Sequence, residues 1–213
     1  MTTQLATHDH SDLIVADPLP ADETPALVYL ASLAPGSRRS MQQALEKIAE
    51  LVTGGQADLV TMNWGALRFQ HTAAVRAALA EQYKPASTNK MLSALRGVLK
   101  ASWQLGQMTA EEYQRATMVK GVRGETLPSG RAATHGELTA LMDACANDAT
   151  PAGARDGAMV AVLYGSGARR AEIVDLDLAD YDPSTGRLVI RGKGNKERVA
   201  FATNGAKDAL DDW

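Results

Sequence analysis

Apolar residues recur at helical spacing through most of the first 120 residues. Met41, Leu45 and Ile48 follow one another at steps of three or four, which places them on one face of a helix. Similar patterns fill the neighbouring segments, and the predicted helices cover residues 24–34, 38–52, 63–83, 87–106 and 109–119. Several amphipathic helices joined by short connections predict a compact helical bundle over residues 24–119.

Turn and cap residues set the expected ends of these helices. Pro35-Gly36 is expected to end the first helix and Lys84-Pro85 the third. Ser37 and Ser87 are the expected N-caps of the helices that follow. Thr109 and Glu112 have the Thr-x-x-Glu spacing of a capping box, which predicts a helix start there.

The pattern changes beyond the bundle. Residues 120–133 combine basic residues, three glycines and a proline with almost nothing to bury, so they are expected to form a basic linker. Thr134 and Glu137 form a second capping-box pattern, and an apolar run follows at 154–165. Alternating, β-branched segments at 186–192 and 196–202 predict a β-hairpin. The fold class expected is mainly α with a small β-hairpin or sheet.

Composition agrees with a globular protein. The chain has 213 residues, 45% of them hydrophobic, and no apolar run near the ~20 residues that cross a bilayer. The N-terminus lacks a basic stretch that leads into a signal core. The single cysteine, Cys145, excludes an internal disulfide. A cytoplasmic location is therefore expected.

Charge is divided unevenly along the chain. The net charge is −3, but residues 1–37 hold five acids and no Lys or Arg. Hydrophobic residues show little periodicity at the start of the chain, so a disordered acidic tail is predicted over residues 1–23. Residues 38–131 hold 13 Lys and Arg against 7 Asp and Glu, whereas residues 132–213 hold 9 against 13. A basic middle is what phosphate neutralisation requires, although a solvated helical surface gives the same count.

Two adjacent arginines in "GSGARRAEIVDL" are the most prominent candidate chemistry. One interpretation is a surface ion pair between Arg169 and Glu172 at i, i+3. The other is that an arginine at a Gly-led turn, backed by an apolar helix, is placed to bind a phosphate through two N–H groups. Neither a P-loop nor a dinucleotide-binding glycine pattern is present in the sequence.

The ordered pair "LYGSGARRAEIVDLDLADYD" and "LVIRGKGNKERVAF" resembles the tyrosine-type site-specific recombinases, the phage-integrase and Xer-like family. That family has a Gly-Leu-Arg-x-Ser-Glu-Leu helix start, a Leu-x-x-x-Asp segment and a hairpin with Gly-Lys-Gly-x-Lys-x-Arg, in this order. Here Ala168 replaces the usual Leu and Ala171 the usual Ser. The resemblance implies a SAM-like helical core-binding domain at 24–119 and the first part of an α+β catalytic domain at 134–213.

The resemblance also implies catalytic roles. Arg169 matches the first catalytic arginine, which holds the scissile phosphate, whereas Arg170 matches none. Glu172 matches a carboxylate that steadies the site, and Lys193 matches the hairpin lysine that protonates the departing 5′-oxygen. In the family a tyrosine attacks and forms a 3′-phosphotyrosyl intermediate. Double-stranded DNA is the implied partner, intact relatives act as tetramers on two DNA sites, and no cofactor or metal is implied.

Expected DNA contacts lie mostly on the basic bundle and should position the protein on phosphates. The candidates are basic or hydroxyl residues: Arg38, Arg39, Ser87, Thr88, Lys90 and Arg96, with Lys120 and Arg123 in the linker. For each, the competing interpretation is a solvated helix residue.

The sequence departs from the family pattern after Lys193. The family continues with His-x-x-Arg and the nucleophilic tyrosine, but the last tyrosine here is Tyr181 and all four histidines precede the motif. A C-terminally truncated recombinase, inactive alone, is therefore expected. Two alternatives stay open: a DNA-binding remnant that competes with an intact recombinase, and a helical protein-interaction module.

Overall fold

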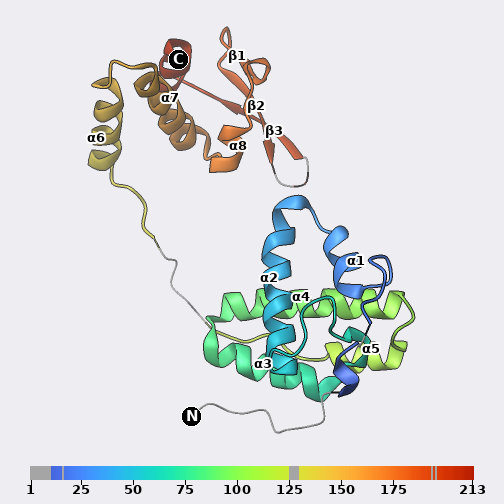
Figure 1. Cartoon of the computed structure of the whole chain (residues 1–213). Coiled ribbons are helices and arrows are strands. Elements are labelled where there is room, and N and C mark those ends of the chain that lie inside the picture. Colours follow the sequence, from blue (N-terminus) through green and yellow to red (C-terminus); the bar gives the residue numbers. More distant parts are fainter. Residues whose placement is uncertain (1–10, 16, 125–129, 193, 195) are drawn as a thin grey trace. The chain divides into compact units, whose positions relative to one another are not determined.

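The computed structural model describes residues 11–15, 17–124, 130–192, 194 and 196–213. The chain forms two compact units that divide between Leu127 and Pro128 (Figure 1). This division falls inside the stretch expected to be a linker.

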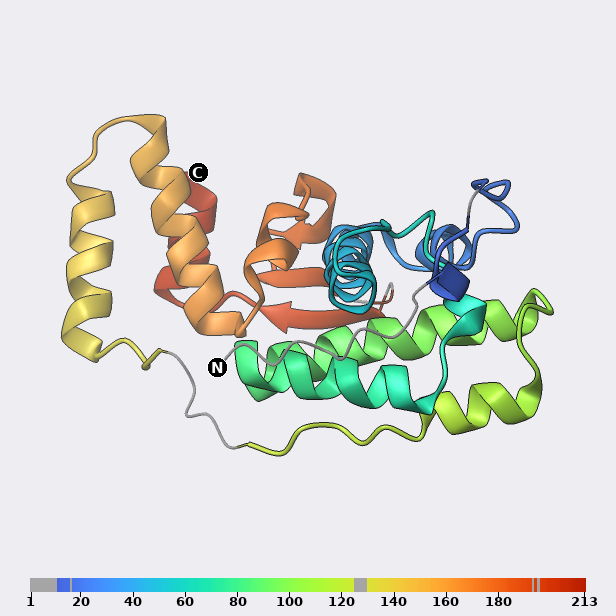
Figure 2. The same cartoon turned by 60° about the horizontal axis from the view of Figure 1, so that its bottom comes forward.

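The first unit is a helical bundle. Its helices are α1 (Pro25–Ala31), α2 (Pro35–Thr53), α3 (Phe69–Gln82), α4 (Pro85–Gln104) and α5 (Ala110–Thr117), with single 3₁₀ turns η1 (Ser11–Leu13) and η2 (Trp64–Ala66). Helix α4 packs against each of the other four helices, and α2 crosses it (Figures 1 and 2). The long central helix therefore supplies the surface on which the bundle assembles.

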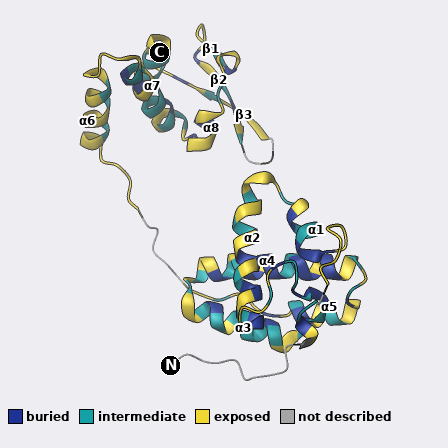
Figure 3. Ribbon diagram, viewed as in Figure 1, coloured by how far each residue is buried: buried dark blue, intermediate teal, exposed yellow. Residues whose placement is uncertain are grey.

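The core of this unit forms where α2 crosses α4. Leu45 and Ile48 of α2 and Leu99 of α4 are fully buried, as their helical spacing predicts. Figure 3 shows buried stretches along the helices of this unit in dark blue. Trp64 in η2 is also buried, and its indole N–H donates a 2.9 Å hydrogen bond to the carbonyl of Leu59. Removing these apolar surfaces from water is the main force that holds the helices together.

Prolines, rather than serines, begin the second and fourth helices. Pro35 and Pro85 occupy the first turns of α2 and α4, where the missing proline N–H has no helical partner to lose. The expectation that Ser37 and Ser87 cap these helices is therefore wrong, and Pro35 starts α2 instead of merely ending α1. The capping box at Thr109 is present, with the Thr109 hydroxyl accepting from the N–H of Glu112 at 3.2 Å.

The described part of the acidic N-terminal segment packs on the bundle. Leu13 is buried, and its carbonyl accepts a 2.9 Å hydrogen bond from the N–H of Asn63. Val15 donates to the carbonyl of Thr61 at 2.8 Å. The disordered tail expected over 1–23 therefore does not extend over these residues. The cause is local, because Leu13 fills an apolar site beside η2.

The second unit joins helices to a small sheet. Its elements are α6 (His135–Ala146), α7 (Pro151–Ser166), α8 (Arg170–Val174), η3 (Leu178–Asp180), β1 (Tyr181–Asp182), β2 (Arg187–Gly192), β3 (Lys196–Phe201) and α9 (Gly205–Asp212). The strands are antiparallel in the order β1-β2-β3, with Val189 opposite Val199. Leu188 and Ile190 of β2 are buried beside α7 and α8.

The fold class matches the sequence prediction: the protein is mostly helical with one small antiparallel sheet. The third strand, β1, is a two-residue addition that the hairpin pattern does not reveal. The capping box expected at α6 is present, since the Thr134 N–H donates to the Glu137 carboxylate at 2.8 Å. Over the described residues, no helix combines the length and apolar character needed to cross a membrane.

Candidate functional site

A tight turn between α7 and α8 places the candidate arginine. Gly167 ends α7 with a φ of +60°, a left-handed conformation that glycine adopts without strain. The Ser166 hydroxyl donates to the carbonyl of Val162 at 2.7 Å and accepts from the N–H of Ala168 at 3.3 Å. Ala168 is buried. The chain is therefore fixed on both sides of the turn, immediately before Arg169.

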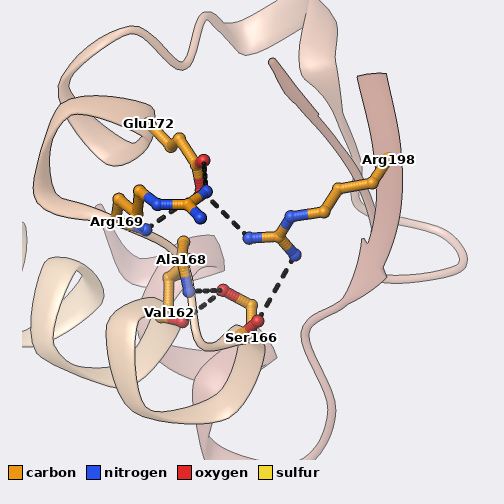
Figure 4. A network of polar contacts seen from close by, with 6 residues as sticks. All are labelled: Val162, Ser166, Ala168, Arg169, Glu172 and Arg198. Atoms are coloured by element: carbon orange, nitrogen blue, oxygen red, sulfur yellow. Dashed lines mark hydrogen bonds and ion pairs between the residues drawn. The ribbon is translucent and has the colours of Figure 1, made fainter. Parts of the chain in front are cut away.

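Arg169 and Glu172 meet at the start of α8 (Figure 4). The Glu172 carboxylate accepts the main-chain N–H of Arg169 at 3.0 Å and its guanidinium Nη1 at 2.6 Å. The Glu172 side chain is 4% exposed, whereas that of Arg169 is 76% exposed. The buried Glu172 carboxylate thus fixes the position of the Arg169 guanidinium, while the Arg169 side chain stays accessible to solvent.

Hydrogen bonding keeps Glu172 ionised. The main-chain N–H of Arg169 lowers its pKa most, followed by the Arg169 guanidinium, and Arg198 adds to both. Together they bring the pKa from 4.5 to about 2, although burial alone would raise it. At neutral pH the carboxylate is therefore a fixed negative charge.

Arg198 brings the hairpin to the same carboxylate. From β3, its Nη2 donates to Glu172 Oε2 at 3.0 Å and its Nη1 to the carbonyl of Ser166 at 3.4 Å (Figure 4). The buried Glu172 carboxylate therefore binds two guanidinium groups, that of Arg169 through Oε1 and that of Arg198 through Oε2. The cluster keeps an excess positive charge, which favours binding of an anion such as a phosphate.

The end of β2 also lies against Glu172. A Cβ at Gly192 would lie 2.9 Å from Glu172 Oε1, so a larger residue there would displace the carboxylate. Lys193 follows Gly192 in the sequence but lies outside the described residues, as does Asn195. The expectation that Lys193 joins Arg169 at one phosphate stays a prediction.

A second buried ion pair ties η3 to the hairpin. Arg191 of β2 contacts both oxygens of Asp180, at 2.7 and 2.6 Å, and the Asp180 side chain is 4% exposed. The Arg191 guanidinium, and next the N–H of Asp177, lower the pKa of Asp180. Two separate carboxylate–arginine contacts, at Glu172 and Asp180, therefore hold the hairpin on the rest of the unit.

The expected DNA contacts of the bundle and the linker fall into three groups: exposed residues, Arg38, and the pair Thr88 and Arg96. Arg39, Ser87, Lys90, Lys120 and Arg123 are exposed. Arg38 is exposed, but its guanidinium donates to the carbonyls of Leu33 and Ala31 at the end of α1. Arg38 therefore stabilises a helix end in addition to any surface role.

Thr88 and Arg96 are placed differently from the expectation. Thr88 is buried, and its hydroxyl donates to the carbonyls of Leu79 and Tyr83 at 3.2 and 3.4 Å. A direct DNA contact by Thr88 is therefore ruled out in this fold, because the hydroxyl points into the bundle. Arg96 is half-buried, and its guanidinium donates to the carbonyl of Val119. Its first partner is thus the protein main chain.

The tyrosines of the second unit differ sharply. Tyr164 on α7 is 71% exposed. Tyr181 donates a 2.6 Å hydrogen bond to Asp211 of α9. Burial, and next this hydrogen bond, raise the pKa of Tyr181 to about 12, which disfavours the phenolate that attacks phosphorus. Tyr181 is therefore poorly suited to be a nucleophile.

Sequence reasoning missed the contacts that cross between distant segments. Arg198 is the last residue of the Gly-Lys-Gly-x-Lys-x-Arg pattern, and that position was the signal available for it. Arg76 and Asn89 bond to the main chain after α5, and nothing in their local patterns indicates this. In the described part of the chain, no group of three or more His, Cys, Asp or Glu side chains is arranged to hold a metal ion.

Known proteins resemble the chain in sequence. Residues 131–213 match the sequence model of the Phage integrase family. The tyrosine recombinase XerC of Proteus mirabilis is 32% identical over 190 residues, covering 85% of this chain and 56% of the relative. XerC of Vibrio atlanticus (strain LGP32) is 32% identical over 178 residues, covering 83% and 54%. The chain spans about half the length of these curated relatives.

Solved structures share the fold. XerH site-specific recombinase, bound to a palindromic difH substrate, has a TM-score of 0.60 at 17% identity, covering 94% of this chain and 63% of that one. A lambda integrase tetramer bound to a Holliday junction has a TM-score of 0.59 at 14% identity, covering 90% and 54%. Because the sequence identities are this low, these structures show only that the chain has the same fold.

Proposed function

Because this chain belongs to the tyrosine recombinase family, we propose that it binds duplex DNA and carries part of a site that cleaves and rejoins DNA strands. The observation that carries the proposal is Arg169. Its side chain is 76% exposed, and its guanidinium is held by a buried carboxylate. A cation that is fixed and still open to solvent suits a phosphodiester, because the donor is already positioned when the phosphate arrives.

The roles follow from this geometry and from the family resemblance. Arg169 holds the scissile phosphate and stabilises the charge on its equatorial oxygens in the transition state. Glu172 orients Arg169. Lys193 protonates the departing 5′-oxygen. The approach of Gly192 to Glu172 supports this last assignment, because Gly192 is the neighbour of Lys193 in the chain.

The bundle and the start of the linker supply the remaining contacts to the phosphate backbone. Arg39, Ser87, Lys90, Lys120 and Arg123 are exposed, so their side chains are available to the DNA surface. We assign them to positioning on phosphates rather than to reading bases. For the intact protein, we propose a tetrameric assembly on DNA, like that of the lambda integrase bound to a Holliday junction.

Alone, this chain is proposed to bind DNA without cutting it. No tyrosine follows Lys193 in this sequence, and Tyr181 is bonded to Asp211 with a raised pKa. The chain then acts either as a piece of a longer recombinase or as a competitor for the sites of an intact one. Binding without a covalent adduct is the outcome expected in both cases.

Duplex binding at several salt concentrations tests the proposal. Fluorescence anisotropy of a labelled duplex of about 30 base pairs should show binding that weakens steeply between 50 and 200 mM salt, as counterion release requires. Charge reversal of exposed bundle residues, Arg39→Glu or Lys90→Glu, should each weaken binding about tenfold at low salt. The absence of binding at 50 mM salt would refute the proposal and favour a protein-interaction module.

Denaturing electrophoresis separates binding from cleavage. After incubation with a nicked duplex that traps covalent intermediates, the protein should run at its unmodified mass. A 3′-phosphotyrosyl adduct in this assay would contradict the proposal that the chain alone is inactive. Its mapping by mass spectrometry would then identify the attacking tyrosine.

A further inference from the structure

We infer that Asn89 is a positioning residue that fixes the first part of the interdomain segment on the bundle and so presents Lys120 and Arg123 to DNA. The inference rests on the proposed DNA binding and goes beyond it, because neither Asn89 nor Arg76 is a candidate DNA contact. It changes the meaning of the segment after α5. Residues 119–124 are bonded to the bundle and are not the first part of a flexible linker.

Three side chains from α3 and α4 bond to this main chain. The Asn89 amide donates to the carbonyl of Val122 at 3.0 Å and accepts the Val122 N–H at 2.8 Å. Arg76 donates to the carbonyl of Lys120 at 2.7 Å and Arg96 to that of Val119. The paired bonds of Asn89 match those that a neighbouring strand would make, so they fix both the position and the direction of the chain.

Close packing supports the same placement. A Cβ at Gly121 would lie 2.9 Å from Asn89 Oδ1, and a Cβ at Gly124 would lie 2.4 Å from Pro85 Cγ. Val119 is buried. Because Gly121 and Gly124 have no side chain, the main chain can lie directly on α4. This close approach explains the two glycines, since neither lies in a turn.

The consequence for binding is preorganisation. The Lys120 and Arg123 side chains are exposed although the main chain that carries them is anchored. A cation on an anchored segment loses less conformational freedom when it meets a phosphate than a cation on a free linker. The two anchoring cations, Arg76 and Arg96, are bonded to carbonyl groups of the chain. They therefore support DNA contacts made by their neighbours.

Tryptic cleavage of the full chain tests the anchor directly. Cleavage after Lys120 requires its carbonyl to leave Arg76, so Asn89→Ala should accelerate it roughly tenfold by removing two hydrogen bonds. Gly121→Ala should act in the same direction by displacing the Asn89 amide. Ser93→Ala, an exposed change on the same helix, is the matched control and should leave the rate unchanged. Equal rates in all four proteins would overturn the inference.

A double-mutant cycle tests whether the anchor acts through the two cations. Asn89→Ala should weaken duplex binding roughly fivefold in the otherwise unaltered chain, with little change in the salt slope. In a chain that carries Lys120→Gln and Arg123→Gln, the same change should have almost no further effect. An equal loss in both backgrounds, or no loss in either, would show that Asn89 is merely structural.

The two proposals fail in different ways. If the unaltered chain binds no duplex at 50 mM salt, both the proposed function and the role of Asn89 in DNA binding are refuted. The tryptic cleavage rates still test whether Asn89 holds residues 119–124 on the bundle. If the unaltered chain binds and the cycle shows no coupling, only the role of Asn89 is refuted. Circular dichroism of Asn89→Ala and Gly121→Ala should show unaltered helix content, which excludes unfolding as the cause.

Discussion

Glu172 holds Arg169 through two different donors, the main-chain N–H at 3.0 Å and the guanidinium at 2.6 Å. The first bond caps α8, and the second aims the side chain. The local fold and the position of the candidate catalytic group therefore depend on one carboxylate. A change at this carboxylate should alter both the stability and the chemistry of the site.

Glu172→Gln should change the response of the protein to acid. The folded pKa of about 2 lies below the ordinary 4.5, so the carboxylate stabilises the fold above pH 4.5 and this stabilisation is lost as the pH falls toward 2. The variant should be less stable than the parent at pH 7, and its stability should decline less between pH 4.5 and 2. Urea unfolding at several pH values measures this. Parallel pH curves for the two proteins would contradict it.

Arg169→Ala should weaken duplex binding about tenfold at 50 mM salt and reduce the magnitude of the salt slope by about 1, because one phosphate contact is lost. Thermal stability should also fall, because the buried Glu172 carboxylate loses one of its two guanidinium partners, so affinity is compared at a temperature where both proteins are fully folded. Arg170→Ala is the matched control, because Arg170 is also exposed but matches no family position. Anisotropy titrations would refute the assignment if both variants lost affinity equally.

Arg198→Gln should loosen the hairpin without unfolding the unit. The variant loses the ion pair to Glu172 and the weaker bond to Ser166, so amide exchange in residues 187–192 and 196–201 should rise roughly tenfold while α7 keeps its protection. Arg198→Lys keeps the charge and should restore part of the protection. Arg155→Gln, an exposed change on α7, should have no such effect. Unchanged exchange in Arg198→Gln would show that the contact is dispensable.

Thr88→Val should lower the free energy of unfolding by about 1 kcal/mol, because the buried hydroxyl gives up its bonds to two carbonyls. Thr88→Ser keeps the hydroxyl and should retain most of that stability. Neither change should alter duplex affinity once folding is allowed for. A loss of affinity in fully folded Thr88→Val would contradict the assignment of Thr88 to a purely structural role.

The sequence by itself determined the helices, the hairpin and the family. Leu45, Ile48 and Leu99 lie in the core because helical spacing puts apolar groups on one face, and that face must leave water. The capping boxes at Thr109 and Thr134 formed because each needs only four consecutive residues. Arg169 and Glu172 meet for the same reason, as neighbours at i, i+3.

Tertiary structure decided every contact between distant segments. The pairing of Arg198 with Glu172 and of Asn89 with Val122 joins residues 26 and 33 positions apart. No local sequence pattern identifies such partners. The sequence around an arginine or asparagine is the same whether its side chain is bonded to water or to a distant part of the protein. Thr88 was misplaced for this reason: its environment is set by α3 packing over it, and a hydroxyl buried by another helix has no signature in its own segment.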